Sequence, residues 1–270
     1  MSRPLWAPAD VPVDRPSVAR MYDYYLGGYH NFEIDRHAAE QAMKIYPDLP
    51  QVMQANRAFL RRAVRFVAEQ GVAQFLDIGS GIPTVGNVHE VAQLASPSAR
   101  VVYVDSDPVA VAHSRAILQD NRSVAVLEAD ARRPGEILAH PDLRRLLDLE
   151  QPTAVLLVAL LHFVVDDEAA AALVHALREA LAPGSFLVIA HATTESAPPE
   201  VTAQMMQLYT RTSSPIKPRS RDEIAALFTG FELVEPGLVY APLWRPEGED
   251  DPFLDRPERA VTSAAVGRKP

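Results

Sequence analysis

One short segment limits the possible folds of this chain more than any other. Residues 75–81 read Phe-Leu-Asp-Ile-Gly-Ser-Gly, an apolar run that ends in Asp77. Gly79 and Gly81 let the chain turn sharply and bring backbone amides against a ligand. The next apolar run closes on Asp105, where a carboxylate can accept both hydroxyls of a ribose. This pairing predicts a nucleoside site in an α/β domain.

The pattern from residue 73 onward predicts a parallel sheet with crossover helices, because short apolar runs alternate with helical segments. We expect strands at 73–78, 100–105, 123–128, 153–159 and 185–190, and helices at 87–95, 108–119, 134–147 and 168–181. Later segments predict helices at 200–210 and after a capping box at 220–223, and two strands at 231–234 and 260–266. The predicted fold class is therefore α/β, with a doubly wound, seven-stranded, mostly parallel sheet.

The segment before the first strand is predicted to be helical. We expect a loose arm over the first 14 residues and helices at 16–26, 33–46 and 51–70. Four of the eight tyrosines fall within residues 22–31, on a helix that ends in a double glycine. Such a helix can close over the crevice, with Tyr22 and Asn31 reaching the ligand, although the tyrosines can equally be ordinary packing residues.

Composition narrows the class of protein and of partner. With 35 acidic and 26 basic residues the net charge is −9, which disfavours nucleic acid or an anionic membrane as a partner. There is no cysteine, which excludes thiolate catalysis, and no histidine spacing is typical of a metal site. No apolar run approaches the length that crosses a bilayer, so we expect a cytoplasmic protein. The sequence permits a homo-oligomer.

The choice between nucleosides depends on the residues around the glycines. A dinucleotide-binding domain normally carries a third glycine, and here Thr84 takes that position. Asp77 would repel a pyrophosphate but attract the ammonium or sulfonium of S-adenosylmethionine. S-adenosylmethionine is therefore favoured. An NAD-dependent oxidoreductase stays an alternative, as does a non-catalytic S-adenosylmethionine-binding module, because no unmistakable general base stands out.

Several segments resemble a known family over nearly the whole chain, and the most specific are residues 19–28, 31–32, 55–64, 75–84, 87–90, 102–108 and 161–163. The chain resembles the class I, Rossmann-like S-adenosylmethionine-dependent methyltransferases, and within them an actinobacterial group of unassigned substrate. The resemblance implies an N-terminal arm and helical lid over 1–70 and a Rossmann-like, S-adenosylmethionine-binding catalytic domain over 71–270.

The resemblance also implies which residues contact the cofactor. The methionine portion would lie against Asp77 and the glycines, the ribose at Asp105, and the adenine beside Ser106 and Asp130. An aspartate after a strand is also a common turn former, so that reading of Asp130 stays open. The full set of expected cofactor residues is Tyr22, Asn31, Asp77, Gly79, Ser80, Gly81, Asp105, Ser106, Asp130, Ala131, Ala159 and Leu160.

The expected reaction transfers a methyl group to O or N of a small-molecule acceptor. The cationic sulfur already makes the methyl reactive, so the protein mainly aligns the acceptor and excludes water. A hydroxyl or amine acceptor also needs a base, and the candidate catalytic residues are His162, Tyr25 and His191. Each histidine can equally be held by a neighbouring loop. Arg57 and its neighbours on the third helix can bind a carboxylate or form a solvated face.

Overall fold

The computed structural model describes residues 14–83, 86–248 and 251–270. Apart from residue 14, the arm expected at the N-terminus lies outside the described residues, and so does Thr84. No helix of the described segments is long and apolar enough to cross a membrane.

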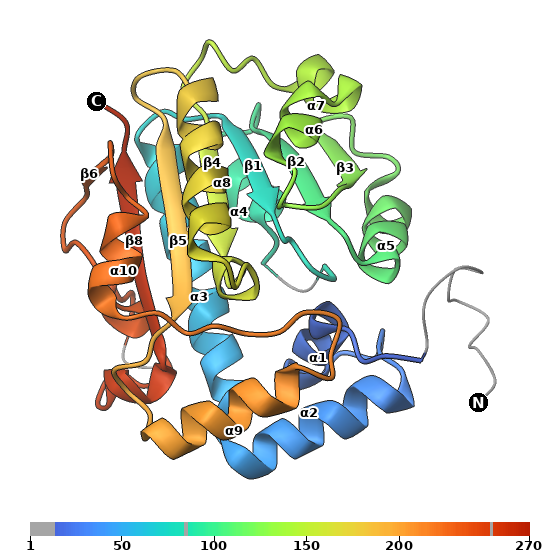
Figure 1. Ribbon diagram of the computed structural model, residues 1–270. Coiled ribbons are helices and arrows are strands. Elements are labelled where there is room, and N and C mark those ends of the chain that lie inside the picture. Colours follow the sequence, from blue (N-terminus) through green and yellow to red (C-terminus); the bar gives the residue numbers. More distant parts are fainter. Residues whose placement is uncertain (1–13, 84–85, 249–250) are drawn as a thin grey trace.

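A central sheet organises the molecule (Figure 1). Its strand order is β3-β2-β1-β4-β5-β8-β6, the five strands at one end being parallel and β8 running antiparallel to β5 and β6. The bounds are β1 Gln74–Ile78, β2 Arg100–Asp105, β3 Val124–Glu128, β4 Ala154–Val158, β5 Phe186–Ala192, β6 Glu232–Leu233, β7 Val239–Tyr240 and β8 Thr262–Arg268. The α/β prediction and its five parallel strands are confirmed. Among the described residues the sheet has one strand more than the seven expected, because the two-residue β7 also pairs with β8.

The helices follow the expected order with one break. Their bounds are α1 Val18–Tyr25, α2 Glu33–Ile45, α3 Leu49–Glu69, α4 Val88–Ala95, α5 Pro108–Leu118, α6 Pro134–Ala139, α7 Pro141–Leu146, α8 Asp167–Ala180, α9 Pro199–Tyr209 and α10 Arg221–Ala226, with short 3₁₀ turns η1 Leu161–Phe163, η2 Ala241–Leu243 and η3 Pro257–Ala260. The single helix predicted over 134–147 was wrong. Pro141 cannot continue a helix that precedes it, so His140 leaves the helical conformation and the chain starts again as α7.

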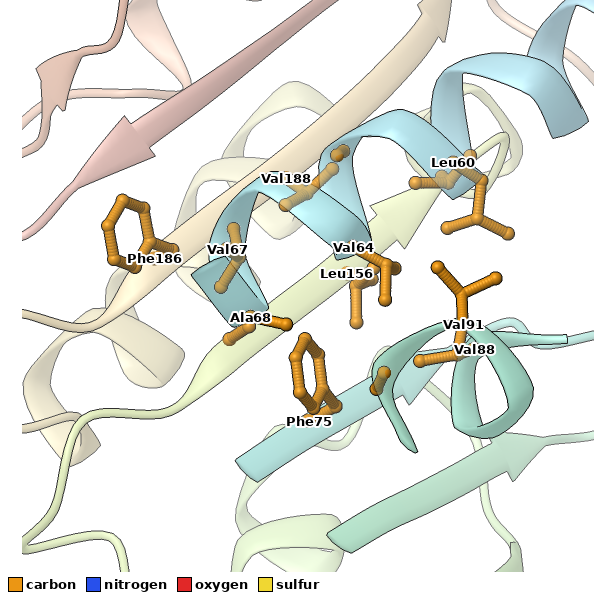
Figure 2. Close-up of a cluster of buried hydrophobic side chains, with 14 of the residues drawn as sticks. Leu60, Val64, Val67, Ala68, Phe75, Val88, Val91, Leu156, Phe186 and Val188 are labelled. Atoms are coloured by element: carbon orange, nitrogen blue, oxygen red, sulfur yellow. The ribbon is translucent and has the colours of Figure 1, made fainter. Parts of the chain in front are cut away.

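Helices cover both faces of the sheet, because alternate side chains of each strand point in opposite directions. Phe75 of β1 packs with α3 and α4 on one face, whereas Leu76 packs with α8 on the other. Figure 2 shows Leu60, Val64, Val67 and Ala68 of α3 facing Phe75, Leu156, Phe186 and Val188 of the strands. The helix α3, which was expected in the lid, therefore packs as part of the sheet core.

A separate apolar cluster joins α1, α2, the start of α3 and α9 below the carboxyl edge of the strands (Figure 1). Met21 and Tyr25 of α1 pack there against Ala39 of α2 and Tyr209 of α9. An ion pair between Arg20 and Asp35, with nitrogen and oxygen 2.9 Å apart and both side chains buried, fixes α1 on α2. These elements are held over the strand ends by contacts of their own.

Candidate active site

A cavity of about 250 Å³ opens where the five parallel strands end. Such strand ends are the usual ligand site of open α/β sheets. Its walls come from the segments after β1, β2, β3 and β4, and from α1, α3 and α9 across from them. The cavity therefore lies between the sheet and the apolar cluster of the N-terminal helices.

The loop after β1 forms one wall, and it needs glycine. Gly79 and Gly81 have φ angles of 76° and 67°, in the left-handed region that favours glycine. The Gly79 amide donates to Val104 O at 2.8 Å, and a Cβ on Gly79 would lie 2.7 Å from the Leu160 side chain. The loop therefore brings bare backbone to the cavity, as predicted for both glycines, and Ser80 and Leu160 also line it.

Asp105 lies at the end of β2 and faces the same cavity. Its carboxylate accepts hydrogen bonds from the amides of Gly81 at 2.7 Å and Asp107 at 2.8 Å. Burial raises the pKa of Asp105 to about 6, although these amides oppose the shift. The carboxylate oxygens are thus fixed in position at a strand end, with further lone pairs for ligand hydroxyls.

Asp77 is the most strongly perturbed carboxylate of the cavity. Its side chain is 6% exposed, and burial raises its pKa to about 7. The Arg57 guanidinium opposes that shift, while the charge of Asp105 adds to it. A cation placed beside Asp77 would restore the ionised form, so this end of the cavity favours a positively charged ligand group.

Two buried atoms of the cavity-lining residues have no hydrogen-bond partner among the described residues, Oδ1 of Asn56 and Nε of Arg57. Both residues line the cavity, as does Tyr22, whose hydroxyl accepts from Asn56 Nδ2 at 2.9 Å. An orphan acceptor and an orphan donor of this kind can bind an ammonium and a carboxylate. Sequence reasoning missed Asn56. The sequence does carry a sign of its role, because Asn56 is a polar residue four positions after Val52, on the otherwise apolar stripe of the helix.

His162 and Tyr25 both line the cavity. The Ala192 amide donates to His162 Nδ1 at 3.4 Å, so the neutral ring carries its proton on Nε2. Burial holds the pKa of His162 well below its usual range, and the neighbouring His191 and Arg219 lower it further. Burial, and after it the Tyr209 hydroxyl, raise the pKa of Tyr25. Both side chains are therefore neutral hydrogen-bond donors near pH 7.

His191 lies off the cavity, because the alternation along β5 turns it to the other side, towards Arg219. Its Nε2 is 2.9 Å from Arg219 Nη1, and its Nδ1 is 2.8 Å from Ala192 O. Both ring nitrogens are thus engaged. His191 is therefore not among the cavity-lining residues, contrary to the placement expected of a catalytic residue, and Ala192 lies in the cavity wall instead.

Two predicted cofactor residues also lie outside the cavity lining. Asn31 is buried beyond the double glycine, where its Nδ2 donates to Asp23 Oδ2 at 2.8 Å and to Gly28 O at 2.9 Å. Asp130 accepts from the Arg132 backbone amide at 2.9 Å and pairs with the Arg132 guanidinium at 2.6 Å. Asp130 is therefore the turn former that the sequence analysis kept as an alternative, and the residues on either side of it line the cavity. The remaining predicted residues, Ser106, Ala131 and Ala159, line the cavity.

The charged end of the cavity fits S-adenosylmethionine. Asp105 offers fixed acceptors for a ribose, and Asp77 with Asn56 Oδ1 suits an ammonium or sulfonium. Arg57 suits the carboxylate of the methionine portion. These side chains offer a partner of opposite charge or polarity to the cationic groups and to the carboxylate of such a ligand, and each buried charge needs such a partner.

Comparison with known proteins agrees with this geometry. A family model described as S-adenosyl methyltransferase matches residues 4–270. A crystal structure of a candidate methyltransferase from Thermobifida fusca YX is 43% identical, with a TM-score of 0.92 over 98% of this chain and 99% of that chain. A DUF574 family protein from Streptomyces avermitilis MA-4680 is 39% identical, with a TM-score of 0.90 over 95% and 98% of the two chains. A search of curated proteins gave no match.

A more distant structure shares the fold alone. An O-methyltransferase family protein from Burkholderia thailandensis is 15% identical, with a TM-score of 0.51 over 87% of this chain and 59% of that chain. Together the family model and the two similar structures confirm the methyltransferase prediction over the oxidoreductase alternative. The chain belongs to the S-adenosyl methyltransferase family and is an S-adenosylmethionine-dependent methyltransferase.

Proposed function

We propose that this enzyme transfers the methyl group to O or N of a small-molecule acceptor held inside the cavity. The observation that carries the proposal is that apolar residues of α1, α3 and α9 line the cavity in addition to the charged residues at the strand ends. A cofactor on Asp77 and Asp105 would leave the part lined by these apolar residues for an acceptor. The enclosure by helices suits a small molecule better than a polymer.

The cofactor, when bound, supplies a methyl group activated by a cationic sulfur. The residues of this chain bind and orient it. Asp105 holds the ribose hydroxyls, Arg57 holds the carboxylate, and Asp77 balances the positive charge. We propose that α1 and α2 act as the lid, because their cluster covers the strand ends and limits the access of bulk water to the cavity.

His162 and Tyr25 are the residues proposed to contact the acceptor. Neither suits the role of general base that the sequence suggested, because the ring of His162 carries its proton on Nε2 and Tyr25 is held in its protonated form. Both can donate a hydrogen bond to the acceptor atom and so fix its lone pair in line with the methyl group. His191 acts indirectly, because Arg219 joins it to the η1 turn that carries His162.

The function is tested by following a labelled methyl group. The protein is incubated with S-adenosylmethionine labelled at the methyl, together with the small-molecule fraction or the macromolecular fraction of a cell extract. We expect label in extractable small molecules, and none when Asp105→Ala replaces the wild-type protein. Label that appears only in protein or nucleic acid would contradict the proposal.

A further inference from the structure

The part of the cavity beyond the cofactor residues has a distinct chemistry. Its walls belong to the apolar cluster of α1, α2, α3 and α9, including Leu49, Met53, Phe163, Met205 and Tyr209. No charged side chain lines this part among the described residues, since Arg57, Asp77 and Asp105 all belong to the cofactor end. An acceptor that enters with a permanent charge would therefore be buried here without a partner of opposite charge, at a large desolvation cost. An uncharged, apolar molecule would gain from the same burial.

The shape of the apolar walls favours a flat ring system. Phe163 and Tyr209 present near-parallel rings, with centroids 6.2 Å apart and planes inclined by 24°. Met53 and Met205 add unbranched, polarisable side chains that pack well against aromatic edges and faces. Aromatic ligands gain from such surroundings beyond the area that they bury.

One buried hydroxyl of this part lacks a hydrogen bond of normal geometry. Burial, and after it the neighbouring Tyr209 hydroxyl, raise the pKa of Tyr25, but the contact between the two hydroxyls falls outside normal hydrogen-bond geometry. A buried hydroxyl with so poor a partner gains when a ligand supplies a better one. His162 provides a second donor through Nε2. The acceptor should therefore carry an oxygen that these two donors can reach.

The missing base restricts the kind of hydroxyl. Tyr25 and His162 donate, and both nitrogens of His191 are engaged, so none of the three takes a proton readily. A phenol ionises near pH 10, as tyrosine does, and a hydrogen-bond donor stabilises the phenolate further. Aliphatic hydroxyls are far weaker acids. An acceptor that loses its own proton to water needs no base from the protein.

We infer that the acceptor is an uncharged, largely apolar aromatic molecule that is methylated on a phenolic oxygen. This rests on the proposed function and names its substrate class. The hydroxyl proton passes to water, and a lone pair of the resulting phenolate oxygen forms the new bond to the methyl carbon. The bond between that carbon and sulfur breaks, and its electron pair stays on sulfur, which leaves as a neutral thioether.

The test compares probes that differ in one property. 2-Naphthol, 2-naphthoate and decahydro-2-naphthol share a bicyclic skeleton and differ in charge or in hydroxyl acidity. Binding is measured by calorimetry on protein loaded with S-adenosylhomocysteine, and methyl transfer is measured by mass spectrometry with S-adenosylmethionine. We expect 2-naphthol to bind roughly tenfold or more tightly than 2-naphthoate, because 2-naphthol enters as a neutral molecule, whereas the carboxylate brings a full charge to walls that offer it no cationic side chain. Only 2-naphthol should gain a methyl group.

Variants of the cavity wall test whether 2-naphthol binds in the apolar part. Met205→Glu adds a carboxylate to the cavity wall and should weaken 2-naphthol binding by about tenfold. Met206→Glu, on the same helix but 38% exposed and outside the lining, is the matched control and should leave it unchanged. Met205→Gln keeps the length without the charge and should have an intermediate effect. Unchanged affinity for S-adenosylhomocysteine shows that each variant is folded.

The outcomes separate the two proposals. Equal binding of 2-naphthol and 2-naphthoate, or methylation of decahydro-2-naphthol at a similar rate, would overturn the phenolic class. Equal effects of the two glutamate variants would also overturn it. Preferential binding of 2-naphthol, with methyl transfer from S-adenosylmethionine only to macromolecules of the cell extract, would instead overturn the proposed small-molecule function.

Discussion

The Asp105 carboxylate accepts a hydrogen bond from the Gly81 backbone amide, with oxygen and nitrogen 2.7 Å apart. The contact joins the end of β2 to the loop that leaves β1, across 24 residues of sequence. It holds the proposed ribose acceptor in position before any ligand arrives. Loop and carboxylate therefore form one preorganised unit, which reduces the ordering needed on binding.

The glycine loop should not tolerate a Cβ at its first glycine. Gly79→Ala forces a left-handed conformation on an L-residue and pushes against Leu160. We expect unfolding free energy to fall by about 1–3 kcal/mol, together with weaker cofactor binding. Denaturant unfolding measures the first effect. Gly135→Ala is the matched control, since it has no positive φ and no atom within 4 Å of the added Cβ, and equal losses in both variants would contradict this account.

Asp77 should favour ligand binding at the expense of stability. The pKa of Asp77 is about 7 in the folded protein, above the usual value of 3.8. The protonated carboxyl therefore leaves stability intact below pH 3.8, and that stability is lost as the pH rises through about 7 and the buried group ionises. Asp77→Asn should therefore raise the unfolding free energy at pH 8 by about 1–4 kcal/mol, and by little at pH 4. Thermal unfolding at both pH values measures this difference.

The same carboxyl group should make cofactor binding depend on pH. A bound cation favours the ionised form, so wild-type affinity for S-adenosylmethionine should rise as pH increases through about 7, with proton release. Calorimetry in two buffers of different ionisation enthalpy counts the protons. Asp77→Asn should bind weakly with no proton release from this site. An affinity that falls with pH in the wild-type protein would contradict the role of Asp77.

His162 should act as a donor. His162→Ala removes the hydrogen bond and should slow methyl transfer by about 10–100-fold, whereas His162→Gln keeps an N–H and should retain more of the rate. The measurement is kcat for each variant over pH 6–9 with 2-naphthol. Equal losses in the two variants, with a wild-type rate that tracks protonation of an imidazole, would indicate a general base instead.

Arg219 should stabilise the η1 turn that carries His162. It is 2% exposed and donates to Leu161 O at 2.9 Å and Val164 O at 2.8 Å, besides contacting His191. Arg219→Met leaves these acceptors buried without a partner and should cost about 2–4 kcal/mol of unfolding free energy. Arg132→Met removes an exposed ion pair and should cost nearly nothing. Similar denaturation midpoints for the two variants would contradict this assignment.

Local patterns were enough to predict most of the fold. Alternating apolar runs and proline or aspartate caps located the parallel strands and their helices, because these signals act within a few residues. Pro141 was also a local signal, for a break in the helix predicted over 134–147, but the prediction did not use it. The pairing of β7 was not predictable in this way, because two residues carry no periodicity and their place depends on β8.

The site was predictable only where the chain itself fixes geometry. Asp77, Gly79 and Asp105 follow from strand ends and turns, which the sequence shows directly. The side chain of Asp130 is held by Arg132, two residues away. The side chain of His191 is held by Arg219, which is far along the chain. Whether such a side chain faces the cavity or a neighbour is decided by packing that no single segment contains.

The central claim is that the strand-end cavity binds S-adenosylmethionine through the Asp105 carboxylate. The most direct measurement is a calorimetric titration of S-adenosylhomocysteine into the wild-type protein and into Asp105→Ala. We predict tight binding to the wild-type protein and an affinity lower by about 100-fold or more in the variant, since the buried ribose hydroxyls lose a charged acceptor. Equal affinity in a variant that remains folded would contradict the claim.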